Sequence, residues 1–330
     1  MSRVTNSLIL DKDCLEAARK QFCLDLGLPW EEYEANRQKS VFIQKSVYVP
    51  NTLDIARVVA RNYADKTSFF RAIICLGQLF ICCDESIYDW VVEQYEACKP
   101  EWFCAFGNLR KLEEKLREHG HRIYDTHVYF LPEAVDNLQE NTKLSGYTFG
   151  QAAVPKSASK AGDDRNEQSN QQNAVGERGC SEENGISDML QTEFLWYNQE
   201  EILYFRENNQ FTSAISFWQG HPDMLAVAAL KEEYQGEGKS FDQSHLSGMA
   251  GTSLDGAYLW QIGINVDKDC AGRGLAHKLV RLMKEEVLRR GKVPFYGTSE
   301  SHTVSQTVGL KAGFVPAWNE VSVERVSTNA

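Results

Sequence analysis

The sequence predicts an α/β or α+β protein built in two parts, and three observations lead to that class. Candidate strands and amphipathic helices alternate along both ends of the 330-residue chain. Between residues 258 and 288 a glycine-rich turn joins an alternating, strand-like run directly to an amphipathic helix. A polar segment separates two stretches that are each long enough to bury a sizeable core.

The polar segment sets the expected domain boundaries. Residues 154–173 contain almost no large apolar side chain, so burial could not offset the entropy lost on ordering them. We interpret residues 147–188 as a disordered linker or insertion. Residues 1–146 then form an N-terminal α/β accessory domain, and residues 189–330 form the C-terminal domain.

In the N-terminal part, the patterns predict strands at residues 46–49, 72–82, 102–106 and 123–131, and helices at 54–63, 87–98 and 108–119. The most apolar stretch, residues 69–83, is interrupted by Arg71, Gly77 and Gln78. It is too short to span a bilayer, and we expect two strands there. No signal peptide is expected at the N-terminus, so we predict a cytoplasmic protein without a membrane segment.

In the C-terminal part, we expect strands at 194–197, 224–230, 258–266 and 293–298, and helices near 199–207, from 275 onward and at 301–312. Residues 249–258 read as a hairpin with Asp255-Gly256 in the turn. The connection 232–245 is longer than a hairpin needs. It is either a tolerated surface insertion or a loop that shapes access to a binding cleft.

The glycine-rich turn has the sequence Gly272-Arg273-Gly274-Leu275-Ala276 and opens the predicted helix. The first amides of a helix lack intrahelical partners and carry a partial positive charge, so this turn is a candidate phosphate or pyrophosphate site. No Gly-Lys-Ser/Thr follows, which excludes a Walker loop. His277 stands where a dinucleotide fingerprint needs its third glycine.

This turn resembles the acyl-CoA pyrophosphate loop of the GNAT superfamily of N-acetyltransferases, whose pattern is Gln/Arg-x-x-Gly-x-Gly/Ala. Gly274 and Ala276 match the pattern, whereas Ala271 stands where Gln or Arg is usual. The Gly313-Phe314 pair looks like the closure before the last strand of that family, and the resemblance covers about residues 194–326. It is closest to a two-part bacterial group.

The resemblance implies a C-terminal GNAT fold, with a mixed, mostly antiparallel sheet flanked by helices, and acetyl-CoA as the co-substrate. The smaller first part looks like a degenerate GNAT half. The backbone of Ile264 and Val266 is expected to pair with the pantetheine arm, and residues 267–276 are expected to wrap the pyrophosphate. The cofactor-binding residues expected in this way are Ile264, Val266, Ala271, Gly272, Arg273, Gly274, Leu275, Ala276, His302 and Ser305.

Acyl transfer to an amine needs a neutral amine, and deprotonating a lysine-like acceptor at neutral pH costs about 4 to 5 kcal/mol. GNAT enzymes commonly carry a glutamate base on the strand that corresponds to residues 260–266, but this strand has no acid. Gln261 occupies a plausible equivalent place. It either orients a water or the acceptor, or is a polar residue on the less buried strand face.

The proton donor to the leaving thiolate is also unusual. The tyrosine that many family members carry on the last helix falls at Gly309 in this chain, so Tyr296 and His302 are the nearest substitutes. Tyr296 is either that acid or a core residue. His302 stands where an asparagine often contacts CoA, and it is otherwise a polar residue at a helix start.

Composition excludes several other classes. The net charge is −11 and no basic stripe is present, which argues against a nucleic-acid partner. The nine cysteines include no Cys-x-x-Cys pair and are expected to be reduced core residues. His119, His121 and His127 lie close in sequence, but no carboxylate or cysteine stands at ligand spacing, so no metal site is expected.

The sequence therefore predicts an N-acetyltransferase that moves an acetyl group from acetyl-CoA to a primary amine by direct attack, with Tyr296, His302 and Gln261 as candidate catalytic residues. The acceptor is a small molecule or a peptide, and the protein is a monomer or a homodimer. The alternative is a catalytically inactive acyl-CoA-binding sensor or interaction module, which the missing glutamate and tyrosine favour.

Overall fold

The computed structural model describes residues 10–47, 60–61, 68–134, 192–207, 209–218, 220–235 and 243–326. The strands are β1 (Val41–Lys45), β2 (Phe70–Cys75), β3 (Gln78–Cys83), β4 (His121–Pro132), β5 (Phe194–Asn198), β6 (Asp223–Leu230), β7 (Leu246–Leu254), β8 (Leu259–Val266), β9 (Val293–Ser299) and β10 (Phe314–Arg325). The helices are α1 (Lys12–Leu26), α2 (Trp30–Ala35), α3 (Tyr88–Tyr95), α4 (Phe106–Glu118), α6 (Gln199–Ile202), α7 (Leu275–Arg289) and α8 (Thr303–Lys311).

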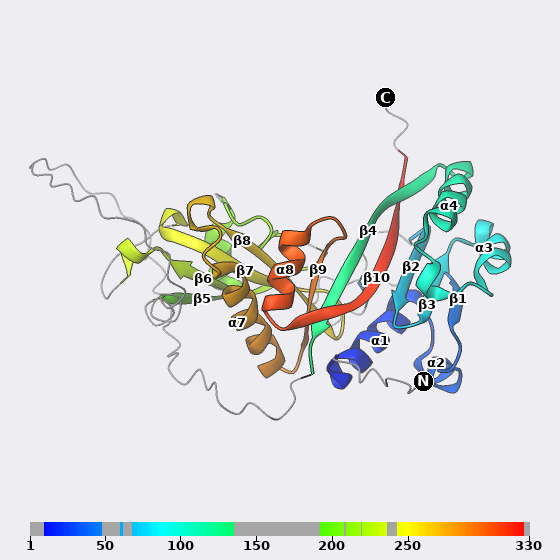
Figure 1. Ribbon diagram of the computed structural model, residues 1–330, viewed down its shortest axis with the longest axis horizontal. Helices are drawn as coiled ribbons and strands as arrows, with labels where there is room; N and C mark the ends of the chain where they lie inside the picture. Colours follow the sequence, from blue (N-terminus) through cyan, green and yellow to red (C-terminus); the bar gives the residue numbers. More distant parts are fainter. Residues whose placement is uncertain are drawn as a thin grey trace, which may run out of the picture.

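All ten strands belong to one sheet, in the order β1-β3-β2-β10-β4-β9-β8-β7-β6-β5. Neighbouring strands are antiparallel except for β1 with β3 and β8 with β9. The sheet runs along the length of the molecule, with α7 and α8 beside its C-terminal strands and α3 and α4 at the other end (Figure 1). The predicted α+β class with a mixed, mostly antiparallel sheet is therefore confirmed.

The two ends of the chain exchange strands at the centre of the sheet. β4, from the N-terminal part, pairs with β9 and β10, and β10, from the C-terminal part, also pairs with β2. The two parts thus share one sheet through β4 and β10. The expected linker, residues 147–188, lies outside the described residues, and the domain boundaries remain a prediction.

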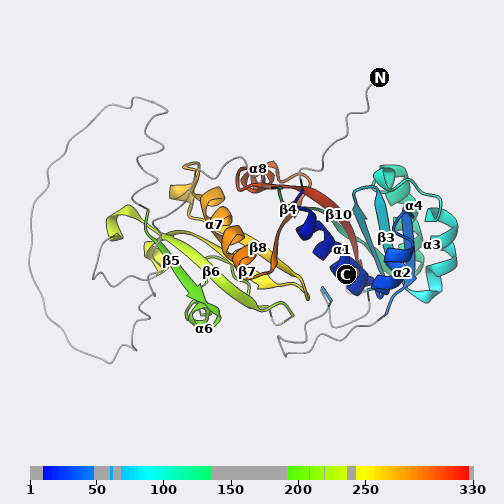
Figure 2. The same ribbon diagram turned by 90° about the horizontal axis from the view of Figure 1, so that it is seen from below.

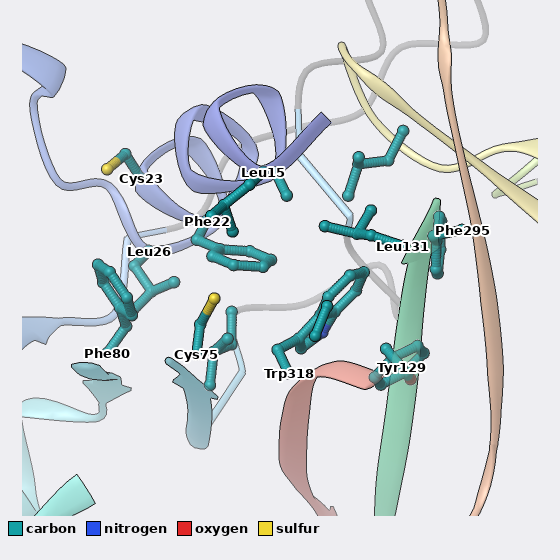
Figure 3. Packing of buried hydrophobic residues seen from close by; sticks show 14 of the residues in the cluster. Leu15, Phe22, Cys23, Leu26, Cys75, Phe80, Tyr129, Leu131, Phe295 and Trp318 are labelled. Atoms are coloured by element: carbon teal, nitrogen blue, oxygen red, sulfur yellow. The ribbon is translucent and has the colours of Figure 1, made fainter. Parts of the chain in front are cut away.

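Helix α1 covers this junction and was not predicted from the sequence. Asp11 caps its start, because the Asp11 side chain accepts a hydrogen bond from the amide of Cys14, and Gly27, with a φ of 70°, caps its end. Phe22 of α1 contacts Trp318 of β10, with ring centroids 5.2 Å apart. The same core includes side chains from β2, β3, β4, β8 and β9 (Figure 3).

Separate cores lie on the two faces of the C-terminal strands, and Figure 2 shows α7 and α6 on opposite sides of them. Leu279, Val280 and Met283 of α7 pack on one face with alternate residues of β6 and β8. Ile202 of α6 and Phe205 pack on the other face. This alternation explains why the strand and helix patterns of the C-terminal part predicted its elements correctly.

One expected strand in the N-terminal part is wrong, and another lies partly outside the described residues. Of the strand predicted at 46–49, residues 46 and 47 are not in a strand: β1 ends at Lys45, and the Ser46 amide only adds one further hydrogen bond to the Cys83 carbonyl. Residues 48 and 49 are outside the described residues. Residues 102–106 contain no strand, because Pro100 starts a 3₁₀ turn over Pro100–Trp102 and α4 begins at Phe106. The predicted strand pair at 69–83 and the helices near 87–98 and 108–119 are confirmed as β2, β3, α3 and α4. Except for Ala60 and Arg61, the expected helix at 54–63 falls outside the described residues.

A buried ion cluster connects the two parts beneath α1. Arg61 lies 2.6 Å from Asp25 of α1 and 2.7 Å from Glu320 of β10, and Arg71 of β2 lies 2.8 Å from Glu320. Burial raises the pKa of Glu320, but Arg61, Arg71 and hydrogen bonds from Arg71 and Trp318 outweigh it and hold the pKa at about 2. Glu320 therefore stays ionised in the core. In the part of the chain that the structure describes, no helix has the length and apolarity to cross a membrane.

Candidate active site

The parallel pair β8 and β9 opens partway along its length. The two strands are paired only from Leu259 to Ile262 and from Val293 to Tyr296. Beyond that point β8 continues beside β7 to Val266, while β9 continues beside β4 to Ser299. Within the described pairing, nothing joins the C-terminal ends of β8 and β9, so the sheet splits between them. The backbone of this stretch of β8 is left without a strand neighbour on the β9 side.

The glycine-rich turn follows β8 at the open end of this split. Gly272 and Gly274 have φ values of 79° and 78°, and Gly274 caps the N-terminus of α7. No side chain caps that helix start. A Cβ added at Gly274 would lie 3.0 Å from the His277 ring, whereas one at Gly272 would meet nothing within 4 Å. The first turn of α7 therefore presents bare main chain, as an anion site requires.

The surroundings of this turn are positively charged. Burial lowers the pKa of His277, and the nearby cations Lys311, Lys278 and Arg281 lower it further. Several cationic side chains are thus concentrated about the first turns of α7. Before the turn, Asp267 holds the loop in place, because its carboxylate lies 3.0 Å from the Lys231 ammonium.

Tyr296 is the last residue of β9 that pairs with β8. Its ring is buried, and its hydroxyl lies 2.7 Å from the hydroxyl of Ser305 on α8. A Cβ added at Gly309 would lie 3.1 Å from this ring, so Tyr296 fills the space beside the position at which the family tyrosine is expected. Burial raises the pKa of Tyr296, partly offset by the bond to Ser305, and the phenol is therefore protonated at neutral pH.

Gln261 reaches the start of the split from the opposite face. It pairs with Phe295 of β9, whereas Tyr296 pairs with Ile262, so the two candidate side chains project from opposite sides of the sheet. A Cβ added at Gly297 would lie 3.5 Å from the Gln261 amide nitrogen and 2.6 Å from the Tyr129 ring. Gln261 and Tyr129 thus converge over a position that has no side chain of its own.

A backbone segment crosses the Gln261 face of the sheet, and sequence reasoning missed it. The Ser213 and Ala214 carbonyl oxygens lie 1.7 and 2.1 Å from where Cβ atoms would stand on Gly263 and Gly251. The Asn265 side chain accepts hydrogen bonds from the Ser213 and Ala214 amides, at 2.7 and 2.9 Å. The two strand-interior glycines were the available signal, because such glycines often mark a close backbone approach.

The remaining predicted site residues lie around the same opening. Ile264 and Val266 are on the stretch of β8 beyond the split, Ala271 and Arg273 are exposed in the turn, and His302 is exposed at the start of α8. His121 instead stacks on Phe69 at a ring distance of 3.9 Å, and the His119 ring packs tilted against Phe69 at 5.6 Å. Among the residues that are described, no group of three potential metal ligands occurs.

Comparisons with known proteins give structural likenesses. No family model and no curated protein matches the chain. A GNAT-family protein from Novosphingobium aromaticivorans is 11% identical over 63% of this chain and 69% of its own, with a TM-score of 0.33. A GCN5-related N-acetyltransferase from Sphaerobacter thermophilus is 10% identical over 81% of this chain and 79% of its own, also with a TM-score of 0.33.

A third solved structure is that of yncA from Salmonella typhimurium with its cofactor acetyl-CoA. It is 14% identical over 42% of this chain and 96% of its own, with a TM-score of 0.27. These three solved structures, all described as acetyltransferases, are among the proteins to which this chain is similar.

Proposed function

We propose that this protein is a GNAT-type N-acetyltransferase that uses acetyl-CoA to acetylate a primary amine of a small molecule or peptide. One observation carries the proposal: an uncapped, glycine-bearing helix start stands at the open end of a split parallel strand pair. Gln261 and Tyr296 flank the beginning of that split from the two faces. We therefore assign three neighbouring regions: the main chain at the α7 start to the pyrophosphate, the open edge of β8 to the extended arm, and the polar groups at the split to the reaction.

The residues present fit acetyl-CoA. The backbone at Gly272, Arg273, Gly274, Leu275 and Ala276 would hold the pyrophosphate, because the first amides of α7 are not capped by a side chain. Ile264 and Val266, on the unpartnered edge of β8, would hold the pantetheine arm, with Ala271, His302 and Ser305 as further contacts. When bound, acetyl-CoA supplies an activated acetyl thioester.

The chain's own side chains then have separable roles. Gln261 orients the acceptor or a water on its face of the sheet, since an amide donates and accepts hydrogen bonds but is not a base. Tyr296 keeps a proton on its phenol and stands ready to donate it to the departing sulfur, with Ser305 fixing the hydroxyl. No side chain of this set carries a covalent intermediate, so the amine attacks directly.

Thiol release tests this function. Acetyl-CoA is incubated with the protein and a panel of tyramine, spermidine and a lysine-containing peptide, and free thiol is measured. We expect Tyr296→Phe to lower kcat much more than it raises KM for acetyl-CoA, because the ring still packs and only the proton is lost. Tyr95→Phe, at another buried tyrosine in the α3 region, is the matched control and should leave both constants unchanged.

The second candidate is an inactive acyl-CoA-binding module, favoured by the lack of an acid on β8. Binding of acetyl-CoA without thiol release from any amine would support this alternative. His302→Ala separates binding from chemistry: it should weaken acetyl-CoA binding if the imidazole contacts CoA. If Tyr296→Phe and His302→Ala both turn over at the wild-type rate, solvent protonates the thiolate and the protein acts by positioning its substrates.

A further inference from the structure

The N-terminal part supplies one wall of the split. Among the described strands, β9 pairs beyond Tyr296 with β4 alone, with Tyr129 opposite Gly297 and His127 opposite Ser299. Paired residues project from the same face of a sheet, so Tyr129 and His127 share the face of Gln261. A strand that precedes residue 147 therefore contributes side chains to the acceptor side of a site otherwise built from the C-terminal part.

His127 lies farther toward the open end than Tyr129. It stands two residues along β4, which is about 7 Å at the usual rise of a strand. The two rings stack with centroids 5.9 Å apart and an interplanar angle of 30°. Tyr129 is buried, whereas the His127 side chain is 34% exposed, so His127 is the member of this pair that solvent or an acceptor can reach.

Carboxylates surround this imidazole. The Asp125 carboxylate lies 3.5 Å from Nδ1 of His127, which leaves Nε2 as the nitrogen without that neighbour. On β10, Glu320 is opposite His127, but Arg61 and Arg71 already pair with it. On the β9 side, Glu300 accepts a hydrogen bond from Thr126 at 2.5 Å. Asp125 is thus the carboxylate closest to the ring, with its other oxygen accepting a hydrogen bond from the Thr126 amide at 2.7 Å, while Glu320 and Glu300 face other partners.

We propose that His127 is the proton acceptor for the amine, in the place of the glutamate that β8 lacks. This inference rests on the proposed function. Nε2 takes one proton from the ammonium, directly or through a water, and later releases it to solvent. The neutral nitrogen then forms a bond to the thioester carbon, and the carbon–sulfur bond breaks. The nitrogen loses its second proton in this step, and the departing sulfur gains one, so the number of protons is unchanged. The products are the amide, the free thiol and one proton.

The test is the pH profile of kcat/KM for tyramine, spermidine and the lysine peptide, measured on the full chain. We expect His127→Gln to lower kcat by about 10² to 10⁴-fold, to leave KM for acetyl-CoA unchanged and to remove the acidic limb of the profile. Free imidazole should restore part of the rate in His127→Ala. His121→Gln, on the same strand but stacked on Phe69, should keep both rate and profile.

The outcomes separate the two proposals. If the wild type releases no thiol with any of the three amines, both proposals fail. If the wild type is active and His127→Gln keeps its rate and its acidic limb, the function stands and the role of His127 is overturned. A rate lost in both His127 variants without imidazole rescue and with an unchanged pH profile also overturns it, since such a loss is merely structural.

Discussion

The two parts of the molecule each carry a strand that leads into a helix, and they start that helix in opposite ways. In the N-terminal part, β3 has a parallel neighbour, β1, and runs into the 3₁₀ turn Glu85–Ile87 and α3. In the C-terminal part, β8 has a parallel neighbour, β9, and runs into α7. The Asp84 carboxylate caps the first 3₁₀ turn, which continues directly into α3. Asp267 caps a 3₁₀ turn after β8 in the same way, but residues 271–274 separate that turn from α7, which follows Gly274 without a side-chain cap.

This difference explains why the start of α7, rather than that of α3, is a candidate for phosphate binding. Asp84 accepts hydrogen bonds from the hydroxyl and the amide of Ser86, and these bonds lower its pKa. An ionised carboxylate therefore already occupies the place of an anion and would repel a phosphate. At the start of α7, by contrast, no side chain caps the first amides of the helix, so they can bind a phosphate. The two parts thus differ in the glycine-rich segment that separates the capped 3₁₀ turn from the helix after β8.

The largest effect is expected from separating the two parts. Residues 1–146 and 189–330, expressed as fragments, should each fail to unfold cooperatively, because β4 lies between β9 and β10. Mixing them should restore a single transition in circular dichroism. A fragment 189–330 that melts like the full chain would show that this part folds without β4, and would contradict the dependence of each part on the other.

Removing one charge from the buried cluster should come next. Glu320→Gln removes one of the two carboxylates of the cluster, so that Asp25 alone faces Arg61 and Arg71, and it should lower the free energy of unfolding by about 3 to 5 kcal/mol. Farther along β10, the partly exposed Glu324 forms an ion pair with Arg122 of β4. Glu324→Gln is the matched control, with an expected change of less than about 1 kcal/mol. Equal effects in urea titrations would contradict a structural role for the cluster.

The same cluster predicts a pH dependence. The pKa of Glu320 is about 2 in the folded protein against an ordinary value of 4.5, so its stabilisation is complete above the ordinary value. It should be lost as the pH falls from about 4.5 toward 2, and this part of the loss should be absent in Glu320→Gln. A wild type and variant that lose stability in parallel over that range would contradict the assignment.

A smaller effect is expected at the capped helix start. Asp84→Ala removes the hydrogen bond to the Ser86 amide and should cost about 1 kcal/mol of stability. It should leave acetyl-CoA affinity unchanged, because the capped start lies outside the proposed site. Chemical denaturation and calorimetry measure the two quantities, and a change in affinity would mean that the two helix starts are coupled.

No effect is expected from shortening the polar segment. Deleting residues 157–177 should leave the melting temperature and any thiol release nearly unchanged, since their composition offers little apolar surface to bury. This prediction rests on composition alone, because these residues lie outside those described. A loss of several degrees would show that the segment packs against the folded parts.

The C-terminal fold could be predicted because its patterns are local. The alternation from Tyr258 to Val266 and the apolar spacing of α7 fix a face within one element, and Gly274 identifies the turn between them. The exchange of β4 and β10 could not be predicted, because it depends on pairing between distant strands. The position of His127 on the same sheet face as Gln261 could not be predicted either, because it follows from the register of β4 with β9 rather than from a motif.

The central claim is that the uncapped start of α7 binds acetyl-CoA, and calorimetric titration tests it most directly. Gly274→Val and Gly291→Val replace glycines at the two ends of α7 whose φ values are 78° and 71°, so each carries a similar backbone cost of about 1 to 2 kcal/mol. We predict that the wild type and Gly291→Val bind acetyl-CoA with equal affinity, and that Gly274→Val binds at least about tenfold more weakly, a loss of about 1.4 kcal/mol. Equal binding by all three proteins, or no binding by the wild type, would contradict the claim.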